Sequence, residues 1–389
     1  MGQLPPVLRM LESARKLTGA QDLGDPHFLD ALNALVESIN AQSNVPDEGL
    51  PAAEERLMRL LVNRLRIQAD LADHPEILRE QLLPPLVISG LPRVGSTKLQ
   101  QLLAKSGDFQ ALLFWQGYNP ARHTERDSRA DEARIAEAVR FLQWRSRRNP
   151  AVNAAHFLAA AEPEEDTYLL EFTLHSYWPT SYFEVPGFLR WLDGKDRDHA
   201  FAYLRQLLQY LQSQFHPPPH RPWVLKSPIN LGYEPQMARQ LPGARFIMLH
   251  RDPVEVVPSL IAIVRELRRL YCGSAGDLSK VAAWALQEYS SATARHLAWR
   301  RTLAPNAVLD LAYTDVRDDY VSVVERVYEF CGMPLAALAR KNMANWVGDN
   351  EQHKHGVHQY TLDESGLSTD LINSTFSDYL RAFSRYIGG

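Results

Sequence analysis

The most informative stretch of the sequence is LVISGLPRVGSTKLQQLL, residues 86–103. Its first three residues form an apolar run between Pro85 and Gly90, which is typical of a short buried strand. The leucines at 99, 102 and 103 then recur at helical spacing and would share one face of a helix. The stretch therefore predicts a strand, a glycine-containing loop and a helix in succession.

The loop has the spacing of a phosphate-binding Walker A loop, but it lacks the usual lysine. Gly90 and Gly95 match the two glycines of G-x-x-x-x-G-K-[ST], and Thr97 matches its last position, whereas Ser96 replaces the lysine. Glycines let backbone N–H groups approach an anion at a helix N-terminus, and Arg93 inside the loop can bind two oxygens of one anion. The pattern favours an anion site, although an ordinary strand–turn–helix corner also fits it.

Three further apolar runs predict strands, and segments with a helical pattern separate them. Strands that alternate with helices predict an α/β fold with a central parallel sheet flanked by helices. The predicted strands are residues 223–226, 244–250 and 307–313.

The first 83 residues have a helical pattern, with leucines at steps of three and four. We therefore expect a helical N-terminal cap over residues 1–85 and an α/β domain over residues 86–389. Residues 130–215 also have a helical pattern, which several prolines interrupt.

Composition excludes several classes of protein. Lys and Arg number 42 and Asp and Glu 46, so the net charge of −4 gives no reason to expect a nucleic-acid partner. The two cysteines are too few for a disulfide framework and favour a reducing compartment. No apolar run approaches the ~18 residues of a membrane span, and the N-terminus does not resemble a signal peptide. We expect a cytoplasmic protein.

A second anion signal is the stretch HRDPVEVVPSL, residues 250–260. Arg251 follows a predicted strand directly, at the sheet edge where ligands of parallel α/β proteins bind. Ser259 lies eight residues later, about two helical turns on. Pro258 removes one N–H from that helix, so the first turns could be distorted. A competing interpretation is that Arg251 pairs with a nearby carboxylate and Ser259 is solvated.

The two signals together resemble sulfotransferases that use 3′-phosphoadenosine 5′-phosphosulfate (PAPS), in particular the bacterial branch. In that family the loop P-[KR]-x-G-[ST]-T holds the 5′-phosphosulfate, and an arginine with a serine eight residues later holds the 3′-phosphate. Here the second pair is Arg251 and Ser259. The first motif corresponds to Pro92 followed by Arg93, Val94, Gly95, Ser96 and Thr97.

Two further family features have counterparts. The family's Y-E-D-L segment, followed by F-x-G, resembles YTDV at 313–316 and FCG at 330–332, so Tyr313 is expected at the cofactor site. A basic-basic-Gly loop against the 3′-phosphate would correspond to Lys354, His355 and Gly356. The resemblance covers residues 86–389 and implies a P-loop-like sulfotransferase that converts PAPS to 3′-phosphoadenosine 5′-phosphate (PAP) without a metal.

The resemblance also suggests catalytic residues. Lys226 lies in WVLKSP, which resembles a segment that carries a lysine near the transferring group; it could instead be a surface lysine. His156 and the later P-x-E segment resemble a family element, so His156 is the first choice as general base. Glu165 would orient that imidazole or bind substrate. A structural histidine is the competing interpretation, and Gln116 replaces a glutamate that related proteins often have.

No metal site is expected. The histidines of HKHGVH, residues 353–358, lack the spacing of ligands on one helix, and Gly356 would break such a helix.

The sequence therefore predicts sulfuryl transfer from PAPS to a hydroxyl or amine of a small acceptor. The aromatic residues of 168–191 would line a pocket for a lipophilic alcohol or phenol, or else build the core. A small-molecule kinase and a catalytically silent PAP-binding module are the alternatives, and a homodimer is compatible with the sequence.

Overall fold

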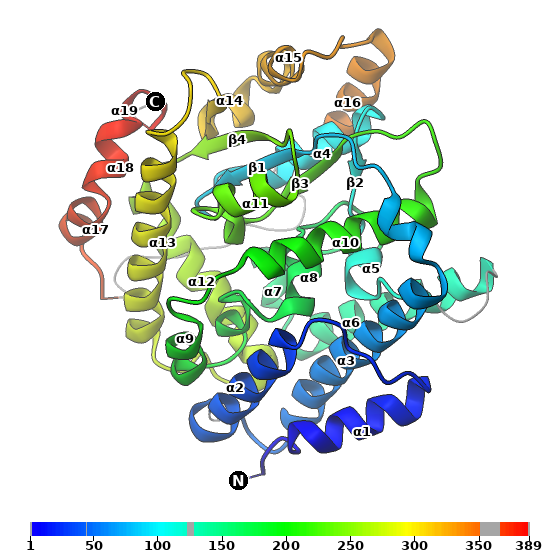
Figure 1. Cartoon of the computed structure of the whole chain (residues 1–389). Helices are drawn as coiled ribbons and strands as arrows, with labels where there is room; N and C mark the ends of the chain where they lie inside the picture. The colour runs from blue at the N-terminus through cyan, green and yellow to red at the C-terminus, as the bar shows by residue number, and fades with distance from the viewer. Residues whose placement is uncertain (1, 44, 123–127, 351–365, 388–389) are drawn as a thin grey trace.

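Five short strands form one parallel sheet in the order β2-β3-β1-β4-β5 (Figure 1). The protein is represented by a computed structural model that describes residues 2–43, 45–122, 128–350 and 366–387. The predicted α/β fold with a central parallel sheet is confirmed; the two-residue strand β2 was not predicted. The strands are β1 (Leu86–Gly90), β2 (Gln110–Ala111), β3 (Trp223–Lys226), β4 (Arg245–His250) and β5 (Val308–Ala312).

Helices cover both faces of this sheet (Figure 1). They are α1 (Val7–Thr18), α2 (His27–Gln42), α3 (Leu50–Asp73), α4 (Ser96–Ser106), α5 (Phe114–Tyr118), α6 (Ser128–Arg148), α7 (Ala151–Ala155), α8 (Thr167–Leu170), α9 (Pro186–Leu192), α10 (Asp198–Phe215), α11 (Glu234–Gln240), α12 (Pro253–Cys272), α13 (Leu278–Arg300), α14 (Tyr313–Asp318), α15 (Tyr320–Cys331), α16 (Ala337–Asp349), α17 (Thr369–Thr375), α18 (Ser377–Ala382) and α19 (Ser384–Ile387). Short 3₁₀ helices are η1 (Pro75–Arg79), η2 (Glu171–Thr173), η3 (Trp178–Ser181) and η4 (Pro228–Asn230).

The central strand β1 is buried along its whole length. It pairs with β4 from Leu86 opposite Arg245 to Gly90 opposite Leu249, and with β3 on its other side. Both faces of the strand are covered, which explains why its sequence is a continuous apolar run and does not alternate. Because all strands run parallel, the loops after β1, β3 and β4 leave the sheet at the same edge.

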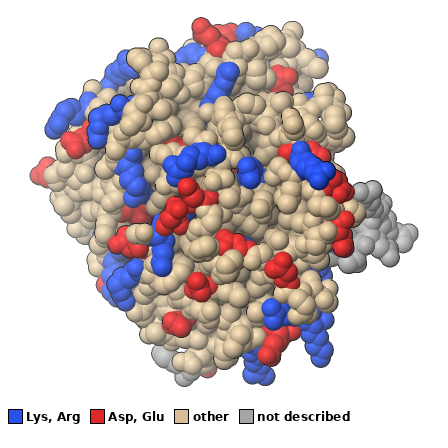
Figure 2. Space-filling view, in the orientation of Figure 1, with Lys and Arg blue, Asp and Glu red and all other residues tan. Residues whose placement is uncertain are grey.

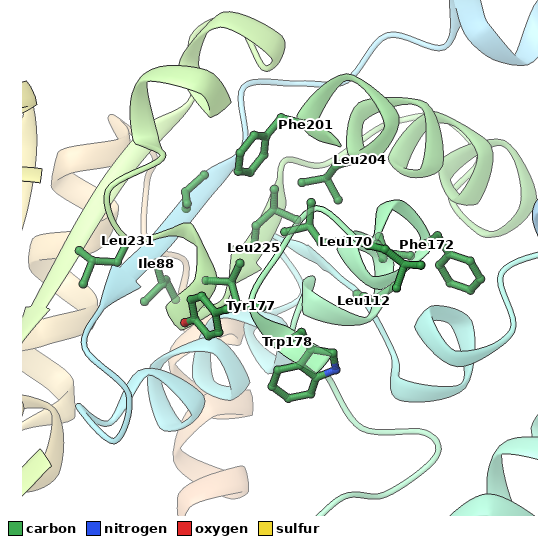
Figure 3. Packing of buried hydrophobic residues seen from close by; sticks show 14 of the residues in the cluster. Ile88, Leu112, Leu170, Phe172, Tyr177, Trp178, Phe201, Leu204, Leu225 and Leu231 are labelled. Carbon is green, nitrogen blue, oxygen red and sulfur yellow. The ribbon is translucent and has the colours of Figure 1, made fainter. Parts of the chain in front are cut away.

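The helices on one face of the sheet supply most of the core around the site. Phe201 and Leu204 of α10 and Tyr177 pack toward Ile88 of β1 and Leu225 of β3 (Figure 3). The aromatic residues of 168–191 are core residues: all are buried except Trp191, which is partly buried. All lie in or against this cluster except Tyr168, which packs in a second cluster with Phe114 and Trp115. They form packing contacts there, so the aromatic stretch is accounted for as core.

The N-terminal helices pack on the rest of the chain through apolar and ionic contacts. One continuous buried cluster contains residues of α1–α3 and of the sheet. In addition, Arg56 and Arg59 of α3 form ion pairs with the buried carboxylate of Glu171 in η2. The domain boundary at residue 85 stays a prediction, because the same buried cluster contains residues from before and after this position.

The visible surface carries no large patch of one charge (Figure 2). Basic and acidic side chains are interspersed over that face, in agreement with the near-neutral composition. Because the net charge is −4, overall charge does not attract an anion, and an anion site has to come from local geometry. Among the described residues, no helix is both long enough and apolar enough to cross a membrane.

Candidate active site

The loop after β1 has the backbone of an anion-binding turn. Arg93 has φ 67° and Gly95 has φ 81°, so both lie in the left-handed region, which is costly for a residue with a Cβ such as Arg93. Gly95 is the N-cap residue of α4, whose first N–H groups have no partner within the helix. Val94 is buried beneath the loop. Ser96 and Thr97 form the first turn of α4, next to the loop backbone.

The second anion signal lies directly beside this loop, because β4 is the neighbour of β1. The guanidinium of Arg251 donates from Nη1 to the carbonyl oxygen of Arg93 over 2.8 Å, and Arg93 donates from Nε to Ser259 Oγ over 3.3 Å. The Arg251 guanidinium also stacks on the ring of Tyr313, 4.1 Å from its centroid. The structure therefore brings together four residues that the sequence placed at one cofactor site.

Arg251 also pairs with a nearby carboxylate, as the competing interpretation expected: its Nε donates to Glu255 Oε2 over 2.7 Å. This ion pair lies on the first turns of α12, which Asp252 caps by accepting from the N–H of Val254. The interpretation of Ser259 as solvated is wrong, because the residue is buried. Helix α12 continues through Pro258 to Cys272.

Lys226 joins the end of β3 to the first turn of α4. Its ammonium lies 2.7 Å from Glu165 Oε1 and 3.3 Å from Thr97 Oγ1. The lysine side chain is 1% exposed, so its interpretation as a surface lysine is wrong, although it does pair with a carboxylate. A buried cation held in this position can neutralise negative charge that develops at the loop.

His156 lies beside Glu164, the residue before Glu165. The distance from His156 Nε2 to Glu164 Oε1 is 3.6 Å, whereas the carboxylate of Glu165 pairs with Lys226. The expectation that Glu165 orients the imidazole is therefore not supported by these contacts, and Glu164 has that position. Burial opposes ionisation of Glu164, but the adjacent imidazole of His156 and the nearby charge of Lys226 hold its pKa below the ordinary value.

The segment that carries these carboxylates is fixed to α4, the helix that follows the loop after β1. Gln100 and Gln101 of α4 donate from their side chains to the carbonyl oxygens of Glu164 and Pro163, both over 3.0 Å. The N–H of Glu164 donates to the carbonyl oxygen of Leu112 over 2.7 Å. Helix α4 therefore positions the loop backbone together with Glu164, the carboxylate beside the candidate base.

Comparison with known proteins agrees with this arrangement. A family model described as the sulfotransferase family matches residues 84–337. This protein belongs to the sulfotransferase family. Two solved structures share its fold: sulfotransferase STF9 from Mycobacterium avium, at TM-score 0.84 and 24% identity over 98% of each chain, and sulfotransferase STF1 from Mycobacterium tuberculosis H37Rv, at TM-score 0.82 and 24% identity over 97% of this chain and 100% of that chain. No curated protein matches the sequence.

Membership in the family confirms that the protein is an enzyme, as its loops predict. This sulfotransferase also contains a buried acid that sequence analysis did not single out. Asp166 Oδ2 accepts from Asn230 Nδ2 over 2.9 Å, and Oδ1 has no hydrogen-bond partner among the described residues. Burial, reinforced by the charge of Glu165, raises the pKa of Asp166 to about 6. The run of acidic residues at 164–166 is the sequence signal from which it could have been found.

Two further expectations concern residues away from these contacts. Lys354, His355 and Gly356 lie outside the described residues. Gln116 of the sulfotransferase is buried, and its Oε1 accepts from the N–H of Leu113 over 3.0 Å, so it fixes the start of α5.

Proposed function

We propose that this enzyme transfers a sulfuryl group from PAPS to a hydroxyl of a small lipophilic alcohol or phenol. The observation that carries the proposal is the contact between the two anion signals, in which Arg251 reaches the loop at Arg93 and Arg93 reaches Ser259. A nucleotide with a phosphate at each end of its ribose needs two such sites side by side. The terminal phosphates of ATP would need the missing Walker lysine instead.

The residues present fit this nucleotide. The left-handed backbone at Arg93 and Gly95 and the free first turn of α4 suit a phosphosulfate, and Arg93 adds a cation. Arg251 and Ser259 offer a guanidinium and a hydroxyl to the 3′-phosphate. Tyr313 lies next to both parts: a Cβ on Gly95 would lie 3.2 Å from its ring, and the Arg251 guanidinium stacks on the same ring.

Bound PAPS supplies an electrophilic sulfur on a phosphate leaving group. The acceptor oxygen forms a bond to sulfur while the bond from sulfur to the phosphate oxygen breaks, and PAP leaves. Lys226 and Arg93 stabilise the negative charge that develops on the leaving oxygen. His156 accepts the proton of the acceptor hydroxyl, and ionised Glu164 stabilises the imidazolium that results.

The surroundings of the candidate base support an apolar acceptor. Phe157, the residue after His156, keeps 46% of its surface exposed. Pockets for apolar ligands are lined mainly by apolar and aromatic side chains, so Phe157 is available to contact such an acceptor. Phe157 takes over the role that sequence analysis assigned to the aromatic residues of 168–191, because those residues are part of the core.

The test is calorimetric titration of the protein with PAP and, separately, with Mg-ATP. We expect PAP to bind and Arg251→Ala to weaken it at least tenfold, because a charged hydrogen bond to phosphate contributes about 1.5–3 kcal/mol. Arg381→Ala is the control, since Arg381 is exposed on α18. Binding of Mg-ATP in place of PAP would instead favour the kinase. PAP binding without turnover of PAPS by any acceptor would favour the silent module.

A further inference from the structure

A cluster of metal-ligating side chains lies where α2 begins against α10. It consists of Asp25, His27 and His199, and one ligand atom of each lies within 4.8 Å of the others. His27 is the first residue of α2 and His199 the second residue of α10. Their imidazole rings stack with centroids 4.4 Å apart and an interplanar angle of 22°. None of the three belongs to the loops that carry Arg93 or Lys226.

The geometry of this cluster leaves a donor atom without a partner among the described residues. Nε2 of His199 is buried and has no hydrogen-bond partner within the described part of the chain. Oδ1 of Asp25 accepts from the backbone N–H of His27 over 3.0 Å and lies 2.5 Å from Nδ1 of the same residue, so the carboxylate is held against the imidazole. A buried ring nitrogen without a partner beside a carboxylate and a second imidazole is what a metal site requires.

A third histidine supports the orientation of the cluster. The ring of His175 meets that of His199 edge-on, with centroids 4.1 Å apart at 89°. Nδ1 of His175 lies 2.9 Å from the carbonyl oxygen of Thr173, which can only accept, so Nδ1 carries the proton. This hydrogen bond fixes the ring, which in turn restricts His199.

We propose that Asp25, His27 and His199 bind one divalent transition-metal ion, with Zn²⁺ as the best fit. Two imidazoles and one carboxylate are a ligand set that Zn²⁺ uses, with water completing the shell, whereas Mg²⁺ and Ca²⁺ prefer oxygen ligands only. Ligand bonds of about 2.0–2.1 Å require donor atoms within about 4.2 Å of one another. The donor atoms lie within 4.8 Å of one another, so binding requires the cluster to contract slightly, and the side chain of His27, 58% exposed, has room to move.

The ion connects α2 to α10, which lie far apart in the sequence. Its effect is on stability, because it binds the folded arrangement of both helices and raises the free energy of unfolding. The sulfotransferase chemistry proposed above does not depend on it, and the metal-site inference does not rest on that chemistry. The sequence did not suggest this site, because no local spacing joins residues 25–27 to residue 199.

The experiment is titration of the metal-free, untagged full-length protein with Zn²⁺ by calorimetry and with Co²⁺ by visible absorption. The background carries His353→Ala, His355→Ala and His358→Ala, because these histidines of the undescribed segment could also bind metal. We expect one site, a Tm that rises with Zn²⁺ and not with Mg²⁺, and at least tenfold weaker binding in His27→Ala and in His199→Gln.

His74→Ala is the matched control, since His74 is also a partly exposed histidine beside a carboxylate, Glu76, and belongs to no such cluster among the described residues. It should keep the wild-type affinity. Absence of Zn²⁺ binding, or equal affinity in His27→Ala and the His74→Ala control, would overturn the proposal. Because His27 is mostly exposed, its substitution leaves the fold intact and the result can be interpreted.

Discussion

At the scale of single residues, the site depends on how buried charges are paired. Lys226 and Glu165 are both buried, and each satisfies the other over 2.7 Å. Removing one partner of such a pair leaves an uncompensated charge, which is strongly destabilising. Loss of activity in a Lys226 or Glu165 variant would therefore combine misfolding with altered chemistry. His156 is the more informative residue to replace, because it is partly exposed.

We predict that His156→Ala lowers kcat by about 10²–10⁴-fold, the usual contribution of general acid–base catalysis. PAP affinity should stay unchanged, because His156 does not contact the phosphate loop or Arg251. The measurement is the rate of PAP release from PAPS with a phenol, 2-naphthol being the first probe. A kcat within twofold of the wild type would instead assign His156 a structural role.

The residue scale also shows the limit of sequence motifs. The resemblance pointed to the segment around His156 and P-x-E, and the structure does bring them together. It pairs the imidazole with Glu164, however, and pairs Glu165 with Lys226. Adjacent residues in an irregular segment point in different directions, and only the tertiary arrangement of β2, β3 and α4 determines which of them faces the histidine.

At the scale of elements, the loop between β1 and α4 depends on Gly95. Its φ of 81° is favourable only for residues without a Cβ, and a Cβ would lie 3.2 Å from the Tyr313 ring. We predict that Gly95→Ala weakens PAP binding at least tenfold in calorimetric titration, because Tyr313 and the loop must move apart. The backbone strain alone destabilises the fold by about 1 kcal/mol.

Gly107 provides a matched control at the other end of the same helix. It has φ 85°, and a Cβ there would meet nothing within 4 Å. Gly107→Ala therefore introduces similar strain without a contact at the site. If both variants bind PAP equally well, the packing of Gly95 on Tyr313 does not shape the cofactor site.

Helix α12 shows an element whose local signals were ambiguous. Pro258 predicted a distorted first turn, yet the helix extends from Pro253 to Cys272. Pro258 is inside the helix and removes only the hydrogen bond that its N–H would donate to Val254, so the helix continues beyond it. Ser259 is consequently fixed on the buried face, within reach of Arg93.

At the scale of the whole molecule, Asp166 couples global stability to pH. Its pKa is raised from 3.8 to about 6 in the folded protein, so the folded state binds more protons than the unfolded state between these values. The contribution of Asp166 to the free energy of unfolding therefore falls as pH rises from about 4 to 6. The difference corresponds to about 3 kcal/mol, because one pKa unit is equivalent to about 1.4 kcal/mol.

We predict that Asp166→Asn removes this loss and raises the free energy of unfolding at pH 7 relative to the wild type. Urea unfolding of both proteins between pH 4.5 and 7.5 measures the free energy of unfolding. The contributions of the other carboxylates cancel in the difference between the two proteins. Asp378→Asn is the control, since Asp378 is exposed on α18. Parallel pH profiles for the wild type and Asp166→Asn would contradict the burial argument.

The sequence by itself determined the parallel α/β sheet, the position of the glycine-containing loop after β1 and the sulfotransferase family. These follow from local signals: short apolar runs separated by segments with a helical pattern, and motifs of fixed spacing such as residues 90–97. The contact between Arg93 and Ser259, the pairing of Glu164 with His156, and the cluster of Asp25 with His199 were decided only by the tertiary structure. Each joins segments distant along the chain, and such contacts depend on how strands are ordered and helices packed, which no local pattern encodes.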